Sequence, residues 1–451
     1  MTTTKSLRGE SVQSGLTRRQ FVALSGAGLA GTMLAGATSS LAAGSRRRRV
    51  AIVGTGGRGV LSWGREIVKE YADVAEIVGL CDTNAKRVEV ARQMLGITVP
   101  TFVDFDLMVR QTRPDAVIVT TMDSVHYRYI LRGLDLGCEV ITEKPLCTDE
   151  QQCQAILDVS RGSANKIIVT HNARHYPETK KMKELLMGKA LGELVSVDYH
   201  EYLNTDHGSS YFRRWHRLKE NSGTLLVTKS CHHFDQVNWL VDAAPTEVSA
   251  RGELRVYGRN GAFRSTRCRG CPCQKQCPSY WDITKDDFAM KLYASCESED
   301  GYLRDGCVFR EDTNIYDTMS VTVKYANQVV LTYTANAFLP YEGQAIVFNG
   351  SKGRLEWNTY SGGGYKNEEL RLTRTFGKSE IITDLPRHEG GHGGADGSLQ
   401  DMIFRTPDAP DPLGLRADVR QGALAALVGI AGYHSIERGG EVVKIANMVK
   451  M

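Results

Sequence analysis

The stretch Arg46–Ser62, RRRRVAIVGTGGRGVLS, decides how the rest of the chain is interpreted. Its apolar run VAIV is typical of a buried strand, and a G-x-G-x-x-G pattern follows directly at Gly54–Gly59. In such a turn the first glycine permits a tight bend, the second lets a pyrophosphate approach the backbone, and the third lets the next helix pack on the strand. That helix directs its free N–H groups toward phosphate. The stretch therefore predicts a dinucleotide-binding strand, turn and helix.

The segments that follow fit the same fold. A second apolar strand, AEIVGLCDTN, brings Asp82 to its end, where a carboxylate accepts hydrogen bonds from ribose hydroxyls and repels a 2′-phosphate. This favours NAD over NADP, although the nearby Arg87 acts against that preference. Further strands are expected at Asp115–Thr121 and in CEVITEKPL, with a helix between them. Strands that alternate with helices at this spacing predict a parallel sheet with its ligand at the carboxyl ends of the strands.

The pattern changes after about residue 169. Val195–Tyr202 alternates with period two, as a sheet with one covered face requires. The expected fold class is therefore α/β plus α+β: a Rossmann-type parallel sheet domain at 45–168, then a domain with an open, mostly antiparallel sheet at 169–451. A closing amphipathic helix and a short strand are expected in Leu415–Ile445.

Size and composition agree with two soluble domains. The chain has 451 residues, of which 41% are hydrophobic and 24% charged, and its net charge is +4. A chain of this length can bury two sizeable cores. The small net charge gives no reason to expect a nucleic acid or an anionic membrane as partner.

The first 44 residues resemble a twin-arginine (Tat) signal peptide. Thr17–Val22 contains the paired arginines, an apolar Gly- and Ala-rich stretch follows, and small residues near Ala42–Gly44 suit signal-peptidase cleavage. The alternative is a transmembrane anchor, although Gly and Ala span bilayers poorly. The resemblance implies an exported, extracytoplasmic protein. Because the Tat route carries folded proteins, a cofactor can be bound before export.

From about residue 48 to 445 the chain resembles the glucose-fructose oxidoreductase, inositol dehydrogenase and rhizopine-catabolism (Gfo/Idh/MocA) family. The glycine turn, the acid after the second strand, TT..SVH and EKPL occur in the family's order. In that family the EKP lysine reaches substrate and nicotinamide, and its proline often follows a cis peptide bond. The resemblance makes Lys144 the substrate-contacting base or donor; the alternative is a solvated lysine. The expected cofactor-binding residues are Gly54, Gly56, Gly57, Arg58, Gly59, Asp82, Thr120, His126 and Glu143.

The segment SGTLLVTKSCHHFDQVNWL matches the family's H-x-x-D at His232 and Asp235. If CHHFDQVNWL is a helix, these two residues share one face, so the carboxylate can fix the imidazole tautomer while the other ring nitrogen transfers a proton. His232 is thus the expected general acid/base. Many family members have Asp where this chain has Thr228, so the proton relay must differ. Lys229 offers a donor or a second base, or is a rim residue.

Two further regions are candidate substrate contacts. Arg174 matches the family's N-x-R-Y/H segment and is expected either to hold a substrate oxygen or to form a structural ion pair. In HEGGHGGADGSLQDMIF, His392 and Asp396 occupy a glycine-rich loop before a helix, which indicates a pocket wall or, less directly, a metal site. A similar segment occurs in NAD-dependent α-N-acetylgalactosaminidases of the superfamily, which hydrolyse glycosides through transient oxidation of the sugar.

Six of the eleven cysteines fall between Cys268 and Cys307, in an insertion at about 262–312. The spacing C-x2-C-x-C-x3-C-P is one residue short of the bacterial iron–sulfur run. A structural zinc site at Cys268, Cys271, Cys273 and Cys277, disulfides, an iron–sulfur cluster or free thiols all remain open.

The sequence thus predicts an exported NAD-dependent oxidoreductase that takes hydride from a sugar or sugar derivative, with the proton moved by Lys144 and His232. The first alternative is a glycosidase with tightly bound NAD, and the second is a non-catalytic, NAD-bound sugar sensor or scaffold. The resemblance also implies a homo-oligomer.

Overall fold

The computed structural model describes residues 46–163, 166–383, 385, 391 and 393–451. The expected signal peptide lies outside the described residues. Within these ranges, every helix is too short or too polar to cross a membrane.

The first sheet is a six-stranded, fully parallel sheet in the order β3-β2-β1-β4-β5-β6. This is the strand order of the dinucleotide-binding fold, in which the order reverses beside β1 and leaves a crevice at the carboxyl ends. The strands are β1 Arg48–Val53, β2 Ala75–Cys81, β3 Thr101–Phe102, β4 Ala116–Val119, β5 Glu139–Thr142 and β6 Ile167–Val169. The expected Rossmann-type sheet is confirmed, with the short strands β3 and β6 as two strands that the sequence pattern did not predict.

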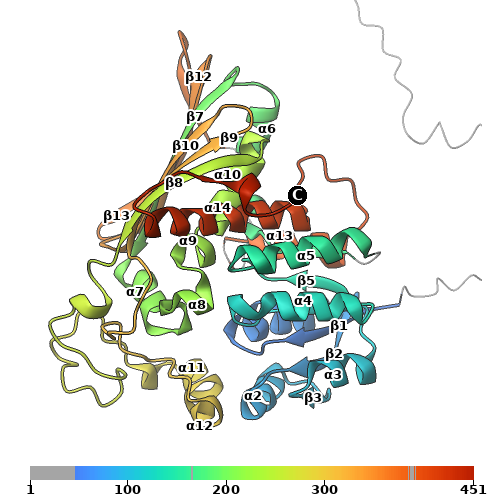
Figure 1. Ribbon diagram of the computed structural model, residues 1–451. Coiled ribbons are helices and arrows are strands. Elements are labelled where there is room, and N and C mark those ends of the chain that lie inside the picture. The colour runs from blue at the N-terminus through green and yellow to red at the C-terminus, as the bar shows by residue number, and fades with distance from the viewer. Residues whose placement is uncertain (1–45, 164–165, 384, 386–390, 392) are drawn as a thin grey trace, which may run out of the picture. The chain divides into compact units, whose positions relative to one another are not determined.

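Helices alternate with these strands (Figure 1). A π-helical segment, Arg58–Gly64, follows the glycine turn and continues as α1. The α-helices are α1 Arg65–Glu70, α2 Ala85–Leu95, α3 Phe105–Thr112, α4 His126–Asp135 and α5 Glu150–Gly162. Side chains that accept from a backbone N–H of the first turn cap three of them, namely Asn84, Asp104 and Asp149.

The second sheet has nine strands in the order β14-β13-β12-β11-β7-β10-β9-β8-β15. All neighbouring pairs are antiparallel except β7 and β10, which confirms the expected mostly antiparallel sheet. Its strands are β7 Leu194–Asn204, β8 Pro245–Glu253, β9 Thr318–Tyr325, β10 Val330–Leu339, β11 Glu342–Gly350, β12 Gly353–Gly362, β13 Tyr365–Arg374, β14 Ser379–Ile382 and β15 Val443–Lys444.

The helices outside the first sheet are α6 Pro177–Met187, α7 Thr205–Arg213, α8 Lys219–Ser222, α9 Leu225–Thr228, α10 Cys231–Val241, α11 Asp287–Leu292, α12 Glu297–Asp300, α13 Ala395–Phe404 and α14 Val419–Glu437. The long helix α14 packs against both β8 and α10 (Figure 1). The expected helix α10 is present, and all of its residues except His232 and Asn238 are buried. The domain boundaries at 168 and 169 remain a prediction; β6, the last strand of the first sheet, ends at Val169, and β7 of the second sheet begins at Leu194.

The cysteine-rich insertion corrects one expectation. All eleven cysteines are free thiols, and no group of three or more ligands that could hold a metal ion occurs in the described ranges, so a zinc site at Cys268, Cys271, Cys273 and Cys277 is not supported. The segment is held by Asp305, which is fully buried and ion-paired with Arg269 at 3.1 Å. Asp305 also accepts from the Arg269 N–H at 3.0 Å, so charge and backbone bonds hold this loop.

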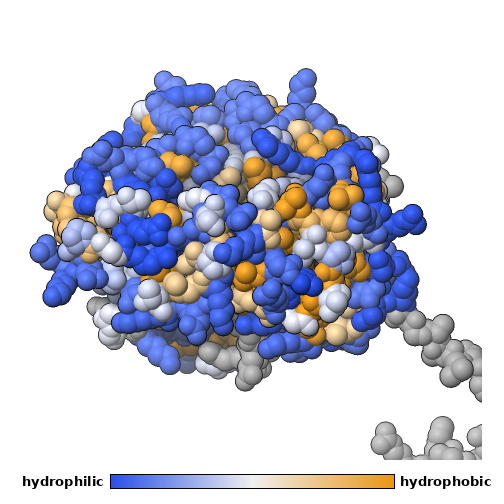
Figure 2. Space-filling view, turned by 90° about the horizontal axis from the view of Figure 1, so that it is seen from below, coloured by the Kyte–Doolittle hydropathy of each residue, from blue (hydrophilic) through white to orange (hydrophobic). Residues whose placement is uncertain are grey.

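The face that Figure 2 shows is mainly hydrophilic, with hydrophobic residues in small scattered groups. Dispersed hydrophobic residues on a mainly polar face are usual for protein surfaces.

Candidate cofactor and active site

The glycine turn has the geometry that its sequence predicts. Gly54 has φ +89°, and a Cβ there would lie 2.7 Å from the backbone of Thr120 at the end of β4. A Cβ at Gly59 would lie 2.3 Å from the carbonyl oxygen of Gly54. Thr120 fixes the turn, because its Oγ1 donates to that carbonyl at 2.5 Å. Only glycine therefore fits at either position, which leaves a cradle that suits a dinucleotide pyrophosphate.

The acid after β2 is tied to the same turn. Asp82 is 8% exposed, and its Oδ2 accepts from the backbone N–H of Thr55 at 2.8 Å. Its Oδ1 accepts from the N–H of Asn84 at 3.0 Å. The carboxylate thus lies beside the turn, where the prediction of ribose recognition requires it.

Tyr293, from the insertion, also meets the turn, which the sequence did not indicate. Its hydroxyl accepts a hydrogen bond from the Gly57 N–H at 2.6 Å. A Cβ at Gly56 would lie 3.3 Å from the same hydroxyl. In this structure a protein hydroxyl therefore takes one of the donors that the turn offers to phosphate.

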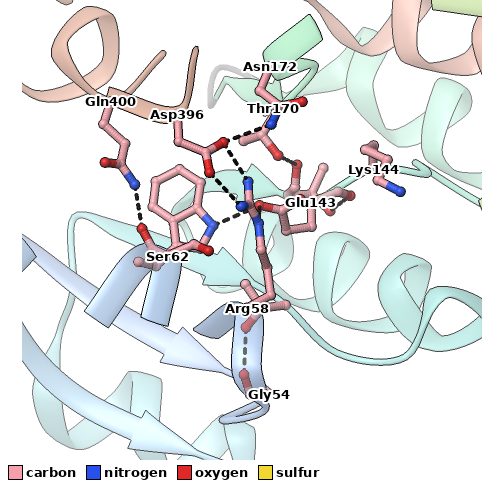
Figure 3. A network of polar contacts seen from close by, with 12 residues as sticks. Gly54, Arg58, Ser62, Glu143, Lys144, Thr170, Asn172, Asp396 and Gln400 are labelled. Atoms are coloured by element: carbon pink, nitrogen blue, oxygen red, sulfur yellow. Dashed lines mark hydrogen bonds and ion pairs between the residues drawn. The ribbon is translucent and has the colours of Figure 1, made fainter. Parts of the chain in front are cut away.

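Arg58 joins the turn to two distant segments (Figure 3). Its Nε donates to Glu143 at 2.6 Å and its Nη1 to Asp396 at 2.9 Å. Asn172 donates to the same Asp396 carboxylate at 2.7 Å, and Trp63 donates to Glu143 at 2.8 Å. Glu143 and Asp396 are both buried, so this network links the first sheet to α13.

The network changes the interpretation of three predicted residues. Arg58 and Glu143 are engaged with each other, so direct contact with a cofactor stays a prediction for both. Asp396 was expected to contact substrate. It lies in the first turn of α13, and its carboxylate is bound to Arg58 and Asn172, so a substrate contact stays a prediction. The other expected residue of this loop, His392, lies outside the described residues.

Lys144 lies at the end of β5, and its bond to Pro145 is cis, as the resemblance implied. Its Nζ donates to the carbonyl oxygen of Thr228 at 2.5 Å. Beside it, the buried His126 has both ring nitrogens at carbonyl oxygens, those of Pro145 at 2.8 Å and Thr121 at 3.0 Å. His126 therefore joins the ends of β4 and β5 rather than presenting a free nitrogen to the nicotinamide side.

His232 lies in the first turn of α10 and remains partly exposed. Burial, together with the charges of Lys144 and Lys229, holds the pKa of His232 well below its usual value, so the imidazole is neutral at neutral pH. Among the described residues, nothing hydrogen-bonds its buried Nδ1. A second histidine, His171, faces it edge-on with ring centroids 6.4 Å apart. Burial lowers the pKa of His171 to about 4.

Asp235 does not bind His232, which corrects the expectation drawn from H-x-x-D. Its oxygens accept from Arg174 at 2.5 and 2.8 Å, and both side chains are only 1% exposed. This geometry fits the ion-pair alternative for Arg174. Because each charge is already satisfied by the other, neither residue needs a substrate oxygen as partner. A substrate role for either residue stays a prediction.

Lys229 is paired with Glu201 of β7 at 3.1 Å. Although burial acts in the opposite direction, the charge of Glu201 raises the pKa of Lys229, so it is a cation and not a second base. Burial raises the pKa of Glu201 itself to about 7. His233 lies 3.5 Å from the same carboxylate, and its Nδ1 is 2.9 Å from the Tyr333 hydroxyl, so it forms part of the core.

Asp123 is a buried carboxyl group at this site that the sequence analysis missed. Burial raises the pKa of Asp123 to about 6, against the charges of His126 and Lys144 and the side chain of Thr228. Asp123 thus places a carboxyl group beside Thr228, the residue at the position where many family members have aspartate. The signal was available, since TTMDSVH follows directly on the carboxyl end of a parallel strand.

Comparisons with known proteins agree with this arrangement. Residues 48–171 match the oxidoreductase family, NAD-binding Rossmann fold, and residues 183–445 match its C-terminal alpha/beta domain. The chain belongs to the Gfo/Idh/MocA family. The Rossmann-type domain is therefore the family's NAD-binding domain, and the expected family resemblance is confirmed.

Relatives cover nearly the whole chain. YteT of Bacillus subtilis (strain 168), named as an oxidoreductase, is 32% identical over 86% of this chain and 96% of its own length. Glycosyl hydrolase family 109 protein 1 of Akkermansia muciniphila is 28% identical over 87% of this chain and 80% of its own. An oxidoreductase from Agrobacterium radiobacter, solved with NAD+, L-tartaric acid and magnesium, has a TM-score of 0.63 at 15% identity, covering 89% of this chain and 100% of that one. This last likeness shows the fold alone.

Proposed function

We propose that the protein is an NAD-dependent oxidoreductase that oxidises a CH–OH group of a carbohydrate. The observation that supports this most directly is the hydrogen bond from Lys144 to Thr228, which brings the EKP lysine against the segment that leads into His232. The family's NAD-binding domain carries the glycine turn and Asp82, whose arrangement fits a dinucleotide.

In this proposal the chain's residues bind and deprotonate the alcohol. An ammonium has three donors, so Lys144 retains two for a substrate oxygen after its bond to Thr228. His232 is neutral and accepts the hydroxyl proton. Asp123, with a pKa of about 6, is the nearby carboxyl group that takes the place of the missing aspartate in proton transfer. Bound NAD supplies the acceptor for the hydride that leaves the carbon.

A direct assay tests this function. Purified protein is incubated with a panel of sugars, uronic acids and inositols, and absorbance is followed at the NADH band near 340 nm. A carbohydrate-dependent rise supports the proposal. Tight sugar binding without any absorbance change supports instead the non-catalytic sensor or scaffold, and absence of both contradicts a carbohydrate substrate.

The glycosidase alternative has its own support. Glycosyl hydrolase family 109 protein 1 aligns with this chain over 80% of its own length. A glycosidase that oxidises its sugar only transiently would regenerate its bound NAD at every turnover. Aryl glycosides separate the two functions: release of aglycone without net NADH favours hydrolysis, and NADH formation without release favours the dehydrogenase.

We also propose that the protein is exported by the Tat route and forms a homo-oligomer. The support for export is the Thr17–Val22 motif. Replacing Arg18 and Arg19 by lysine is expected to keep the protein in the cytoplasm, which cell fractionation measures. Native mass spectrometry of the purified mature protein reports bound nucleotide and subunit count together.

A further inference from the structure

The cysteine-rich insertion lies against the NAD-binding domain. Its helices α11 and α12 lie beside α2 (Figure 1), and α11 contacts α2 directly. Ile283, Leu292 and Tyr293 are buried in the same hydrophobic cluster as Val50 and Ile52 of β1. The insertion thus forms a wall of the dinucleotide half and is more than an appendage to the second sheet.

Asp300, the last residue of α12, reaches the start of α2. Its Oδ2 accepts from Arg87 Nη2 at 2.7 Å and from Asn84 Nδ2 at 2.9 Å. Asn84 also donates to the carbonyl oxygen of Cys296 at 3.0 Å. The insertion therefore binds directly to residues that follow Asp82, the acid expected at the ribose.

Arg87 is held between two carboxylates. Its Nη1 lies 3.5 Å from Asp82 on one side, and Asp300 takes its Nη2 on the other. The rings of Tyr293 and Tyr302 flank the guanidinium, with their centroids 5.7 and 5.9 Å from its carbon. An arginine near the ribose acid is the group that accommodates a 2′-phosphate in NADP enzymes. Here both of its Nη groups face carboxylates, so two negative charges surround one positive charge, while the buried Nε has no hydrogen-bond partner among the described residues.

We propose that the insertion makes the enzyme specific for NAD, with Asp300 as the residue that withholds Arg87 from a 2′-phosphate. This inference rests on the proposed use of NAD. Asp82 alone leaves Arg87 free to turn toward an added phosphate. Asp300 prevents this movement, because it binds the Arg87 guanidinium and because its own carboxylate repels the phosphate dianion.

The test compares dissociation constants for NAD+ and NADP+ by isothermal titration calorimetry, without substrate. Asp300→Asn keeps the size of the side chain and an acceptor oxygen for Asn84 but removes the charge. It is expected to tighten NADP+ binding about tenfold while NAD+ binding changes less than about threefold. The matched control is Asp312→Asn, the same change on the same insertion, because Asp312 pairs with Arg217 instead. That variant is expected to leave both constants unchanged.

A second variant tests the role of Arg87 itself. Adding Arg87→Gln to Asp300→Asn is expected to abolish the gain in NADP+ affinity. The inference is overturned if Asp300→Asn leaves the ratio of the NAD+ and NADP+ dissociation constants unchanged. It is also overturned if the gain in NADP+ affinity survives in the double variant that lacks Arg87. Either result leaves the proposed use of NAD intact. A wild-type protein that binds neither nucleotide overturns the proposed cofactor and the inference with it.

Discussion

Lys144 of the NAD-binding domain donates a hydrogen bond at 2.5 Å to the carbonyl oxygen of Thr228, the last residue of α9. The two residues are far apart in the chain, yet this contact brings the end of β5 to the segment immediately before His232.

Lys144→Ala is expected to lower turnover by about 10²- to 10⁴-fold, the usual contribution of a positioned proton-transfer group. Binding of NAD+ and the melting temperature should change little, because the lysine is partly exposed and makes one backbone contact. Turnover and calorimetric NAD+ binding are measured beside Lys181→Ala, a surface lysine of α6. Undiminished turnover would remove Lys144 from the mechanism.

The adjacent histidines of α10 should respond differently. His232→Gln is expected to reduce turnover with little effect on stability. His233→Leu is expected to lower the free energy of unfolding by about 1–3 kcal/mol, because the buried Tyr333 hydroxyl and the Glu201 carboxylate each lose one of their polar contacts. Steady-state kinetics and urea denaturation of both variants separate the catalytic role of His232 from the structural role of His233. Lost turnover in His233→Leu with lost stability in His232→Gln would assign proton transfer to His233.

The Asp123 carboxyl should make stability depend on pH. Since burial raises the pKa of Asp123 to about 6, the native state keeps a proton that the unfolded chain releases near pH 4. The free energy of unfolding therefore falls as pH rises through this interval. Asp123→Asn should remove about 1–3 kcal/mol of that fall. Melting temperatures near pH 4 and 7.5, with the exposed Asp408→Asn as control, check this; an Asp123→Asn effect equal at both pH values would contradict it.

The Arg174–Asp235 pair is expected to act on stability. Arg174→Met leaves the Asp235 carboxylate buried and unpaired, which typically costs about 3–5 kcal/mol in the free energy of unfolding. The control is Asp158→Ala, which removes one member of the exposed Asp158–Arg161 ion pair and should change the free energy of unfolding little. Urea denaturation measures both. A stable Arg174→Met protein with a greatly raised KM would favour the substrate role instead.

The Tyr293 hydroxyl is expected to compete with the cofactor. Tyr293→Phe frees the Gly57 N–H and should tighten NAD+ binding by about two- to tenfold, the value of one net hydrogen bond. The control is Tyr302→Phe, which removes the hydroxyl of the other ring that flanks Arg87. Calorimetry of both variants decides the point, and weaker binding by Tyr293→Phe would mean that the hydroxyl helps to hold the phosphate.

Much of the site could be predicted because strand ends are local features. The glycine turn, Asp82, Thr120 and Lys144 each follow an apolar strand, and the carboxyl ends of parallel strands meet at one edge of a sheet. Asp123 and His171 obey the same rule and could have been found by it. Glu201 gave no such signal, because alternation in β7 does not tell which side chain meets a lysine.

The cysteine spacing and the H-x-x-D motif misled for a related reason. The spacing of residues along a helix or loop shows which side chains can come close to one another. It does not show which other side chains compete for them, and Asp235 binds Arg174 rather than His232 one turn away. Likewise, a short run of cysteines does not reveal that Asp305 and Arg269 hold the loop.

The sequence by itself determined the parallel nucleotide-binding sheet, the mostly antiparallel second sheet and the residues at the strand ends, because backbone geometry and hydrophobic periodicity act over short distances. Only the tertiary structure decided which charges neutralise one another, namely Arg58 with Asp396, Arg174 with Asp235 and Arg87 with Asp300. Those pairings join residues distant in the chain, and a buried charge selects whichever partner the packed core brings to it.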